Sequence, residues 1–272
     1  MESRKTRFES KTQLTNPQQH HGGFNFLGVI LLIIFLIAMI FRMTLFNEKF
    51  VAHELSNSTI TSKIVTNVNQ NLTQYGLPDN VMTKKQADTL IKTSVKQVYA
   101  GDEIDLNLNP TFNRAEKLVN ENLEGLGVST SLLPTSVTST VKAKINSVVT
   151  QQINTEQIQS VTSELLAAKR IDTIMLIVSG ILLAVMIIRA LIGHHLISSL
   201  SWILIISALL TLVFVKGLTL FIPNLLANSS YLSLSTLSDQ AVHDFGHFGY
   251  ELALIILIVG AVLLGTRKAF KR

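Results

Sequence analysis

Residues 24–41 read FNFLGVILLIIFLIAMIF, an apolar run in which Asn25 is the only polar side chain. A helix needs roughly 20 apolar residues to cross the hydrocarbon core of a bilayer, which is about 30 Å thick. Further runs of this kind cover about residues 173–192, 200–222 and 250–265. The sequence therefore predicts an all-α membrane protein with four transmembrane helices.

The composition agrees with this prediction. Of the 272 residues 47% are hydrophobic and 15% are charged, whereas about 25% are charged in an ordinary soluble domain. The chain has no cysteine, which excludes disulfides, thiolate catalysis and zinc–thiolate or iron–sulfur sites. A net charge of +5 without a basic stripe argues against a nucleic-acid partner. We predict the lipid bilayer as one partner and no cofactor.

Lysine and arginine near the ends of spans predict the orientation, because they collect on the cytoplasmic side. One topology brings the first tail, the turn after the second span and the last tail to the same side. The basic residues there are Arg4, Lys5, Arg7, Lys11, Arg189, Arg267, Lys268, Lys271 and Arg272. We therefore expect a multi-pass protein of the cell membrane with both termini in the cytoplasm and the loop 47–170 outside.

The predicted organisation follows from these spans. It comprises a tail 1–23, span 24–46, outside domain 47–170, span 171–192, turn 193–199, span 200–222, outside loop 223–249, span 250–266 and tail 267–272.

The outside domain is predicted to be mostly helical. The helix of the first span is expected to continue past the membrane as a stalk, and a second stalk helix over 136–169 is expected to run into the second span. Thr83 and Gln86 have the spacing of a capping box that starts a further helix. Residues 102–110 alternate apolar and polar side chains, which favours an extended segment. The two stalks either pair under a small helical cap or stay unpaired and mobile.

Three short motifs carry a resemblance to a known family. They are FNEKFV at 46–51, GLP at 76–78 and YAGDEIDL at 99–106. In this order they resemble an uncharacterised family of four-span membrane proteins of Gram-positive bacteria, which have a large helical domain after the first span. The resemblance implies that fold and a Gram-positive envelope, and it implies no activity.

The stretch HDFGH at 243–247 stands apart, because its spacing on a helix is typical of a metal site. On a helix, His243 and His247 share a face, as in the H-E-x-x-H motif of zinc proteases, with Asp244 in place of the glutamate. A third ligand is missing from the stretch itself. The alternatives are histidines that pack at the outer membrane interface, or a pair that responds to pH.

The missing third ligand would come from elsewhere in the chain. His53, Glu54 and Asp102 are the candidates in the outside domain. The sequence has no Gly-rich phosphate loop and no G-x-S-x-G elbow, so we assign no catalytic residue.

Lys216 and Glu251 are charged residues inside predicted spans. A charge at the centre of a bilayer is unfavourable by about 2.5–3.5 kcal/mol or more, so such groups usually pair. Counting at 1.5 Å per residue puts both at the same depth. We expect a Lys216–Glu251 ion pair that fixes the register of the third and fourth spans.

These features predict a non-enzymatic envelope protein that presents its outside domain to a partner, such as another membrane protein, or that senses the envelope. The sequence leaves its oligomeric state open. One alternative is a membrane-embedded metal hydrolase built on His243, Asp244 and His247. The other is an accessory subunit of a transporter, which Lys216 and Glu251 suggest.

Overall fold

The computed structural model describes a helical protein with no strand among the described residues. Four of the helices contain apolar stretches long enough to cross a membrane, namely Gly23–Met43, Thr162–Ile192, Ser199–Ile222 and Ala241–Thr266. They confirm the predicted number of spans and indicate a multi-pass membrane protein. The described residues are 21–74, 77–125, 139–140, 142–147, 156–192, 196–227 and 235–269.

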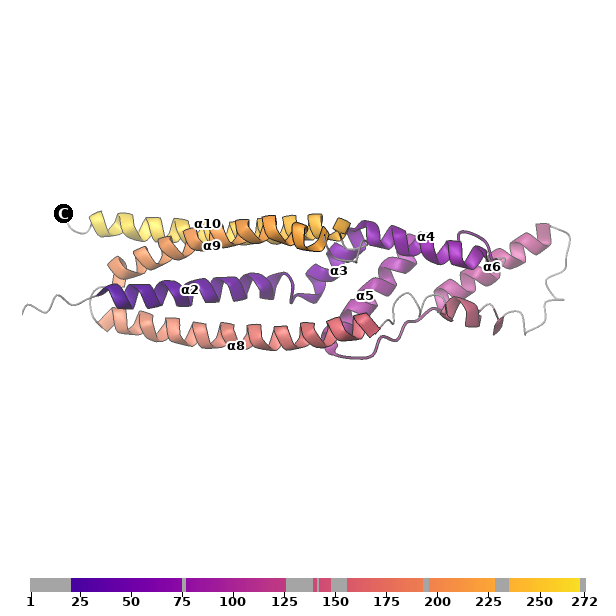
Figure 1. Cartoon of the computed structure of the whole chain (residues 1–272), viewed down its shortest axis with the longest axis horizontal. Helices are drawn as coiled ribbons and strands as arrows, with labels where there is room; N and C mark the ends of the chain where they lie inside the picture. Colours follow the sequence, from indigo (N-terminus) through magenta and orange to yellow (C-terminus); the bar gives the residue numbers. More distant parts are fainter. Residues whose placement is uncertain are drawn as a thin grey trace, which may run out of the picture.

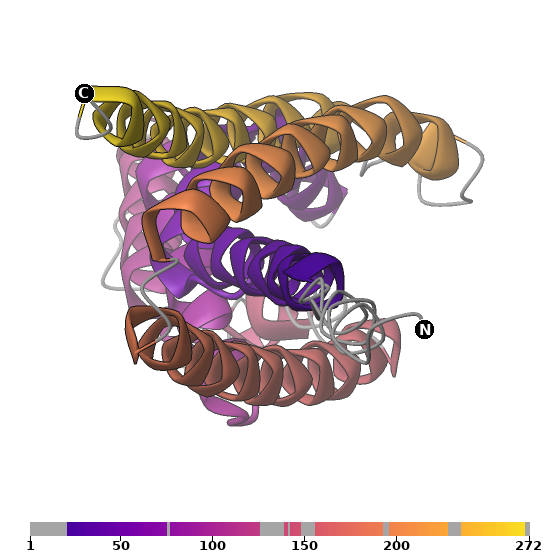
Figure 2. The same cartoon turned by 90° about the vertical axis from the view of Figure 1, so that its left-hand side faces the viewer.

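The four long helices form one bundle. They are α2 (His21–Met43), α8 (Glu156–Ile192), α9 (Leu196–Ala227) and α10 (Ser235–Ala269), and they lie side by side in Figure 1. Seen along the bundle in Figure 2, α2 lies between α8 on one side and the pair α9–α10 on the other. The start of α2 and the end of α10 lie at the same end of the bundle, opposite the shorter helices.

Glycines bring α10 close to α9. A Cβ atom at Gly246 would lie 2.7 Å from Cγ2 of Thr219, and one at Gly249 would lie 2.8 Å from Cγ2 of Val215. Small residues at such contacts let helix backbones approach in a membrane, where dispersion and not the hydrophobic effect holds helices together. The low helix propensity of glycine is therefore offset by packing against α9.

The helix boundaries around the second outside loop differ from the predicted ones. Residues 223–249 were expected to be a loop, but α9 continues to Ala227 and α10 begins at Ser235. Pro223 and the glycines at 246 and 249 led to the shorter estimate, because each disfavours a helix when only local preference is considered. Residues 228–234 lie outside the described part of the chain.

The first span does not continue as a stalk, which is a second correction. The helix α2 ends at Met43, and a turn over 44–46 precedes α3 (Glu48–Asn57). The Thr44 hydroxyl donates a hydrogen bond to the carbonyl of Ile40 at 2.6 Å. The side chain of Asn47 then caps α3 by accepting from the backbone N–H groups of Lys49 and Phe50. Capping of this kind satisfies donors that a new helix leaves unpaired.

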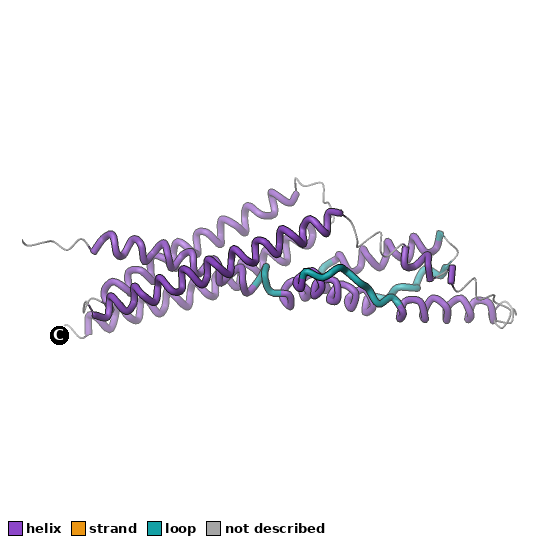
Figure 3. Tube along the Cα trace, turned by 90° about the horizontal axis from the view of Figure 1, so that it is seen from below, coloured by secondary structure: helices purple, strands orange, loops and turns teal. Residues whose placement is uncertain are grey.

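The remaining short helices form the domain beyond the bundle, which we call the head domain (α3 to α6; Figures 1 and 3). It contains α4 (Thr59–Thr73), α5 (Lys84–Ala100) and α6 (Asn109–Gly125). The capping box of Thr83 and Gln86 is present at the start of α5, and Gly101 ends α5 with a positive φ of 80°. Residues 102–108 form neither helix nor strand. The buried core of this domain comprises Val68, Leu72, Leu77, Val81, Met82, Ala87, Leu90, Leu108, Ala115 and Ile145.

The second stalk is the upper part of α8, which runs unbroken for 37 residues into the bundle. Of its predicted start at 136, only residues 139–140 and 142–147 are described, and they are helical. The predicted pairing of two stalks has no counterpart among the described residues, because the helix of the first span ends at Met43. Instead Leu165 of α8 packs against a cluster that contains Ala52 of α3 and Val95 and Tyr99 of α5.

Candidate functional site

Charged and polar side chains gather where the head domain meets the bundle. His243, Asp244 and His247 all lie in the first half of α10, so the predicted helical spacing is correct. Each imidazole faces a carboxylate of its own helix. Nδ1 of His243 lies 3.1 Å from Oδ1 of Asp244, and Nδ1 of His247 lies 3.5 Å from Oε1 of Glu251.

The described residues do not complete the metal site of the alternative hypothesis. No group of three or more His, Asp or Glu side chains among them is arranged to hold a metal ion. Of the candidate third ligands, His53 is exposed and lies 2.9 Å from the side-chain amide nitrogen of Asn57. Asp102 is exposed in the loop after α5. Among these three candidates, Glu54 is the one whose side chain interacts with Asp244.

The predicted Lys216–Glu251 ion pair is not formed between the described side chains. Glu251 instead contacts His247 of the same helix. Lys216 is exposed on α9 and lines an open groove of ≈ 390 Å³ between α9 and α10. The expectation assumed that an acid and a base at equal depth must turn toward each other, whereas an i,i+4 neighbour on one helix is always within reach.

Glu54 and Asp244 form the least ordinary contact of this region. The Glu54 side chain is on α3 and is only 5% exposed, and its Oε2 atom has no hydrogen-bond partner among the described atoms. Burial raises the pKa of the Glu54 carboxyl above its ordinary value of 4.5; the Asp244 carboxylate raises it further and His53 lowers it. A hydrogen bond between two carboxyl groups requires a proton on one of them. The pair therefore holds a proton most readily on Glu54.

The local fold explains why an acid is buried there. The buried positions of α3 are Ala52, Glu54 and Ser56, which do not lie on one helical stripe. They are buried because α3 is enclosed from several sides, with contacts to α4, α5 and α10. Ala52 faces the cluster with Val95 and Tyr99, and Glu54 faces Asp244.

A second polar contact joins the ends of two spans, and the sequence analysis missed it. Arg42 at the end of α2 donates a hydrogen bond from its Nη1 atom to the hydroxyl of Thr173 on α8 at 2.9 Å. Asp172, the preceding residue, is buried. Arg42 and Asp172 each stand at the edge of an apolar run and carry opposite charges. This shared position is the sequence signal that would have predicted that the ends of the two spans lie together.

Tyr99 links three elements at the same level. Its hydroxyl donates a hydrogen bond to the backbone carbonyl of Leu45, in the turn after α2. The ammonium group of Lys169 on α8 lies 5.4 Å from the centre of its ring, within the range of a cation–π interaction. Burial, with the nearby Glu48 carboxylate, raises the pKa of Tyr99 to about 12.

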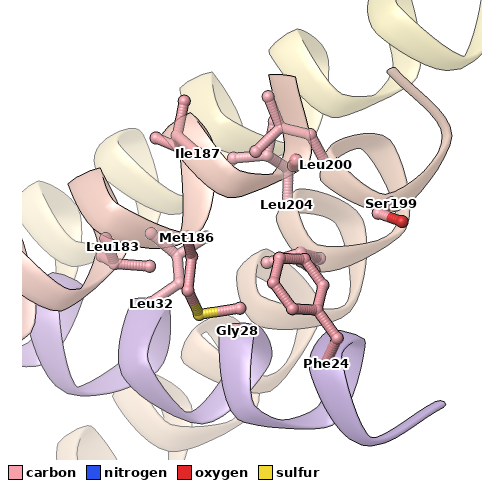
Figure 4. Close-up of a pocket in the computed structure, with 11 residues that line it drawn as sticks. Phe24, Gly28, Leu32, Leu183, Met186, Ile187, Ser199, Leu200 and Leu204 are labelled. Atoms are coloured by element: carbon pink, nitrogen blue, oxygen red, sulfur yellow. The ribbon is translucent and has the colours of Figure 1, made fainter. Parts of the chain in front are cut away.

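At the opposite end of the bundle the described residues enclose an apolar cavity. A cavity of ≈ 100 Å³ lies between α2, α8 and α9, lined by apolar side chains such as Phe24, Met186 and Leu204 (Figure 4). The hydroxyl of Ser199 is the polar side-chain group at its edge. Because nothing in its lining titrates, the polar region at the head domain is the candidate site.

Comparison of the chain with protein-family models, with curated proteins and with solved structures found no match. The structure thus defines the class, a multi-pass helical membrane protein with a helical head domain, and its site must be interpreted from its own geometry. The resemblance to a family of Gram-positive bacteria stays a prediction.

Proposed function

We propose that this protein is a non-enzymatic sensor of the cell envelope, whose head domain stands outside the membrane and responds to pH. The contact between Glu54 of α3 and Asp244 of α10 carries the proposal, because it joins the head domain to a span through a proton. When the shared proton is present, the two carboxyl groups hydrogen-bond. When it is lost, the buried Glu54 carboxylate and the half-buried Asp244 carboxylate face each other and repel.

The direction of the response follows from the raised pKa of Glu54. Glu54 holds the proton more tightly in the folded state than an exposed glutamate does. The hydrogen bond to Asp244 therefore stabilises the contact between the head domain and α10 fully below about pH 4.5, the ordinary pKa of a glutamate. The stabilisation is lost as the pH rises through the raised value. The charged groups that act on Glu54 are Asp244 from α10 and His53 from its own helix. Low pH therefore holds α3 of the head domain against α10, and higher pH weakens this contact.

The proposed orientation rests on the arrangement of the bundle. The start of α2, the end of α8, the start of α9 and the end of α10 lie together at the end away from the head domain, and Arg189 is in the last turn of α8 there. Basic residues collect on the cytoplasmic side. We place that end in the cytoplasm, the head domain outside, and another membrane protein as the receiver of the movement.

The pH response can be measured with spin labels, since the chain has no cysteine of its own. Labels at Ser62→Cys on α4 and Leu254→Cys on α10, both exposed, report the distance between head domain and bundle in nanodiscs. We expect a narrow distance distribution near pH 4, below the ordinary value of 4.5, and a longer or broader one near pH 8.

Glu54→Gln supplies the decisive comparison, because glutamine keeps a hydrogen-bond donor for Asp244 at every pH. We expect its distribution to stay narrow throughout. Asp88→Asn is the matched control, since Asp88 on α5 also has a carboxyl oxygen without a described partner; this variant should respond to pH as the wild type does. The same pH response in Glu54→Gln as in the wild type, or none in the wild type, would contradict the proposal.

A further inference from the structure

The open groove that Lys216 lines between α9 and α10 is the second polar feature of the bundle, and the proposed function does not use it. Its other polar lining residues are Thr219, His243, His247 and Tyr250. The Thr219 hydroxyl donates to the carbonyl of Lys216 at 2.9 Å and is thereby occupied. The groove thus presents an ammonium group, two imidazoles and a phenol, and no carboxylate lines it.

The groove lies near the end of the spans that faces the head domain. Lys216 precedes Ile222, where the apolar stretch of α9 ends, by six residues, and His247 follows Ala241, where that of α10 begins, by six. At 1.5 Å per residue both lie about 9 Å inside the same end of the bundle. The long lysine side chain extends its charge toward the interface from such a position.

The surrounding surface faces lipid. Val213, one turn before Lys216 on α9, and Leu220, which lines the groove, are 69% and 59% exposed. Side chains this apolar and this exposed on a membrane-spanning helix contact acyl chains. A lipid head group is therefore the ligand that can approach Lys216 from the side, within the plane of the bilayer.

The charge of Lys216 is not neutralised by a described side chain. The nearest acid expected to pair with it, Glu251, contacts His247 instead, and Asp244 contacts His243. A cation within a span is unfavourable without an anion, and the phosphate of a phospholipid is the anion that the membrane supplies at the interface toward which the lysine side chain extends.

We propose that this groove binds the head group of an anionic phospholipid, with Lys216 as the counter-ion of its phosphate. The hydroxyl of Tyr250 offers a further donor from α10. Nε2 of His243 and of His247, the nitrogens turned away from the carboxylates, donate as well when the rings are protonated. Binding joins α9 and α10 at the membrane surface next to the head domain.

Native mass spectrometry of the full chain tests the proposal. The detergent-purified protein is titrated with phosphatidylglycerol and, separately, with phosphatidylcholine of the same acyl chains. We expect tighter binding of phosphatidylglycerol. A basic residue near a membrane surface contributes about 1 kcal/mol toward an anionic lipid, so Lys216→Gln should lower the affinity for phosphatidylglycerol about fivefold. The affinity for phosphatidylcholine, whose phosphate charge is offset by its own choline cation, should fall by less.

Two variants separate a loss of binding from a loss of folding. Lys216→Arg keeps the charge and should keep the preference. Lys63→Gln removes an exposed lysine of α4 in the head domain and should change nothing. Equal binding of both lipids by the wild type, or an undiminished preference in Lys216→Gln, would overturn the proposal. An added arm with inorganic phosphate should leave the bound lipid in place; its displacement would assign the groove to free phosphate and overturn the lipid assignment.

Discussion

The hydroxyl group of Tyr99 donates its hydrogen bond to the backbone carbonyl of Leu45, a residue 54 positions earlier in the chain. This contact ties α5 of the head domain to the turn in which α2 ends and α3 has not yet begun. Lys169 of α8 covers the ring of the same tyrosine. One side chain thus connects the head domain to both spans that flank it in the sequence.

Tyr99→Phe should therefore loosen the head domain. Loss of one buried hydrogen bond lowers stability by about 1 kcal/mol, and we expect a lower midpoint of thermal unfolding in detergent. Tyr250→Phe is the matched control, because the Tyr250 hydroxyl has no hydrogen bond to a described residue. In an absorbance titration, the difference between wild type and Tyr99→Phe should show a phenol with a pKa of about 12. Since this folded value is raised, the tyrosine's contribution to stability is lost as the pH rises from about 10 to 12. A normal titration near pH 10 would show that Tyr99 is not buried in this contact.

Gly249→Ala should separate α10 from α9. The new Cβ would lie 2.8 and 2.9 Å from the two γ carbons of Val215, which is itself fully buried and cannot move aside. Overpacking of this kind destabilises by about 1–3 kcal/mol. Gly265→Ala, on the same helix with nothing within 4 Å of the added atom, should be neutral. Adding Val215→Ala should restore much of the loss in an unfolding titration with denaturing detergent, and additive effects of the two changes would argue against the contact.

The proposed orientation predicts a simple labelling pattern. With no cysteine in the chain, a single Ser62→Cys in the head domain should react with a membrane-impermeant maleimide in intact cells. Ser10→Cys in the first tail should react only after the cells are made permeable. The reverse pattern would turn the protein around in the membrane and remove the argument that the head domain meets the outside medium.

Elemental analysis tests the metal-hydrolase alternative. Because the described residues assemble no three-ligand set around His243 and His247, we expect no stoichiometric transition metal in the purified protein. The double variant His243→Ala/His247→Ala should give the same result. One metal ion per chain that disappears in the variant would restore the hydrolase and count against a purely sensory role.

Some features of this fold could be predicted because the signals are local. The four spans follow from hydropathy alone. The start and end of α5 follow from Thr83, Gln86 and Gly101, whose roles depend on neighbours in sequence. The same kind of reasoning would have found the end of α2, because Asn47 followed by Glu48 is a typical N-terminal cap.

Other features depend on contacts between distant parts of the chain. Glycine lowers helix propensity wherever it stands, so the helical start of α10 became visible only with Thr219 and Val215 beside Gly246 and Gly249. Asp244 was considered as the partner of histidines on its own helix. Its contact with Glu54 depends on how α3 is turned after the break at 44–46, which local sequence preference does not determine.

The unbroken course of α8 has a mechanical consequence. Its 37 residues make a rod about 55 Å long, whereas the first span ends in a turn before the head domain begins. A straight, unbroken helix transmits a tilt along its whole length. A tilt of about 5° at the head domain would displace the far end of such a rod by about 5 Å. The turn after α2 can act as the hinge while α8 acts as the arm, so that a small swing of the head domain would displace the opposite end of α8 sideways.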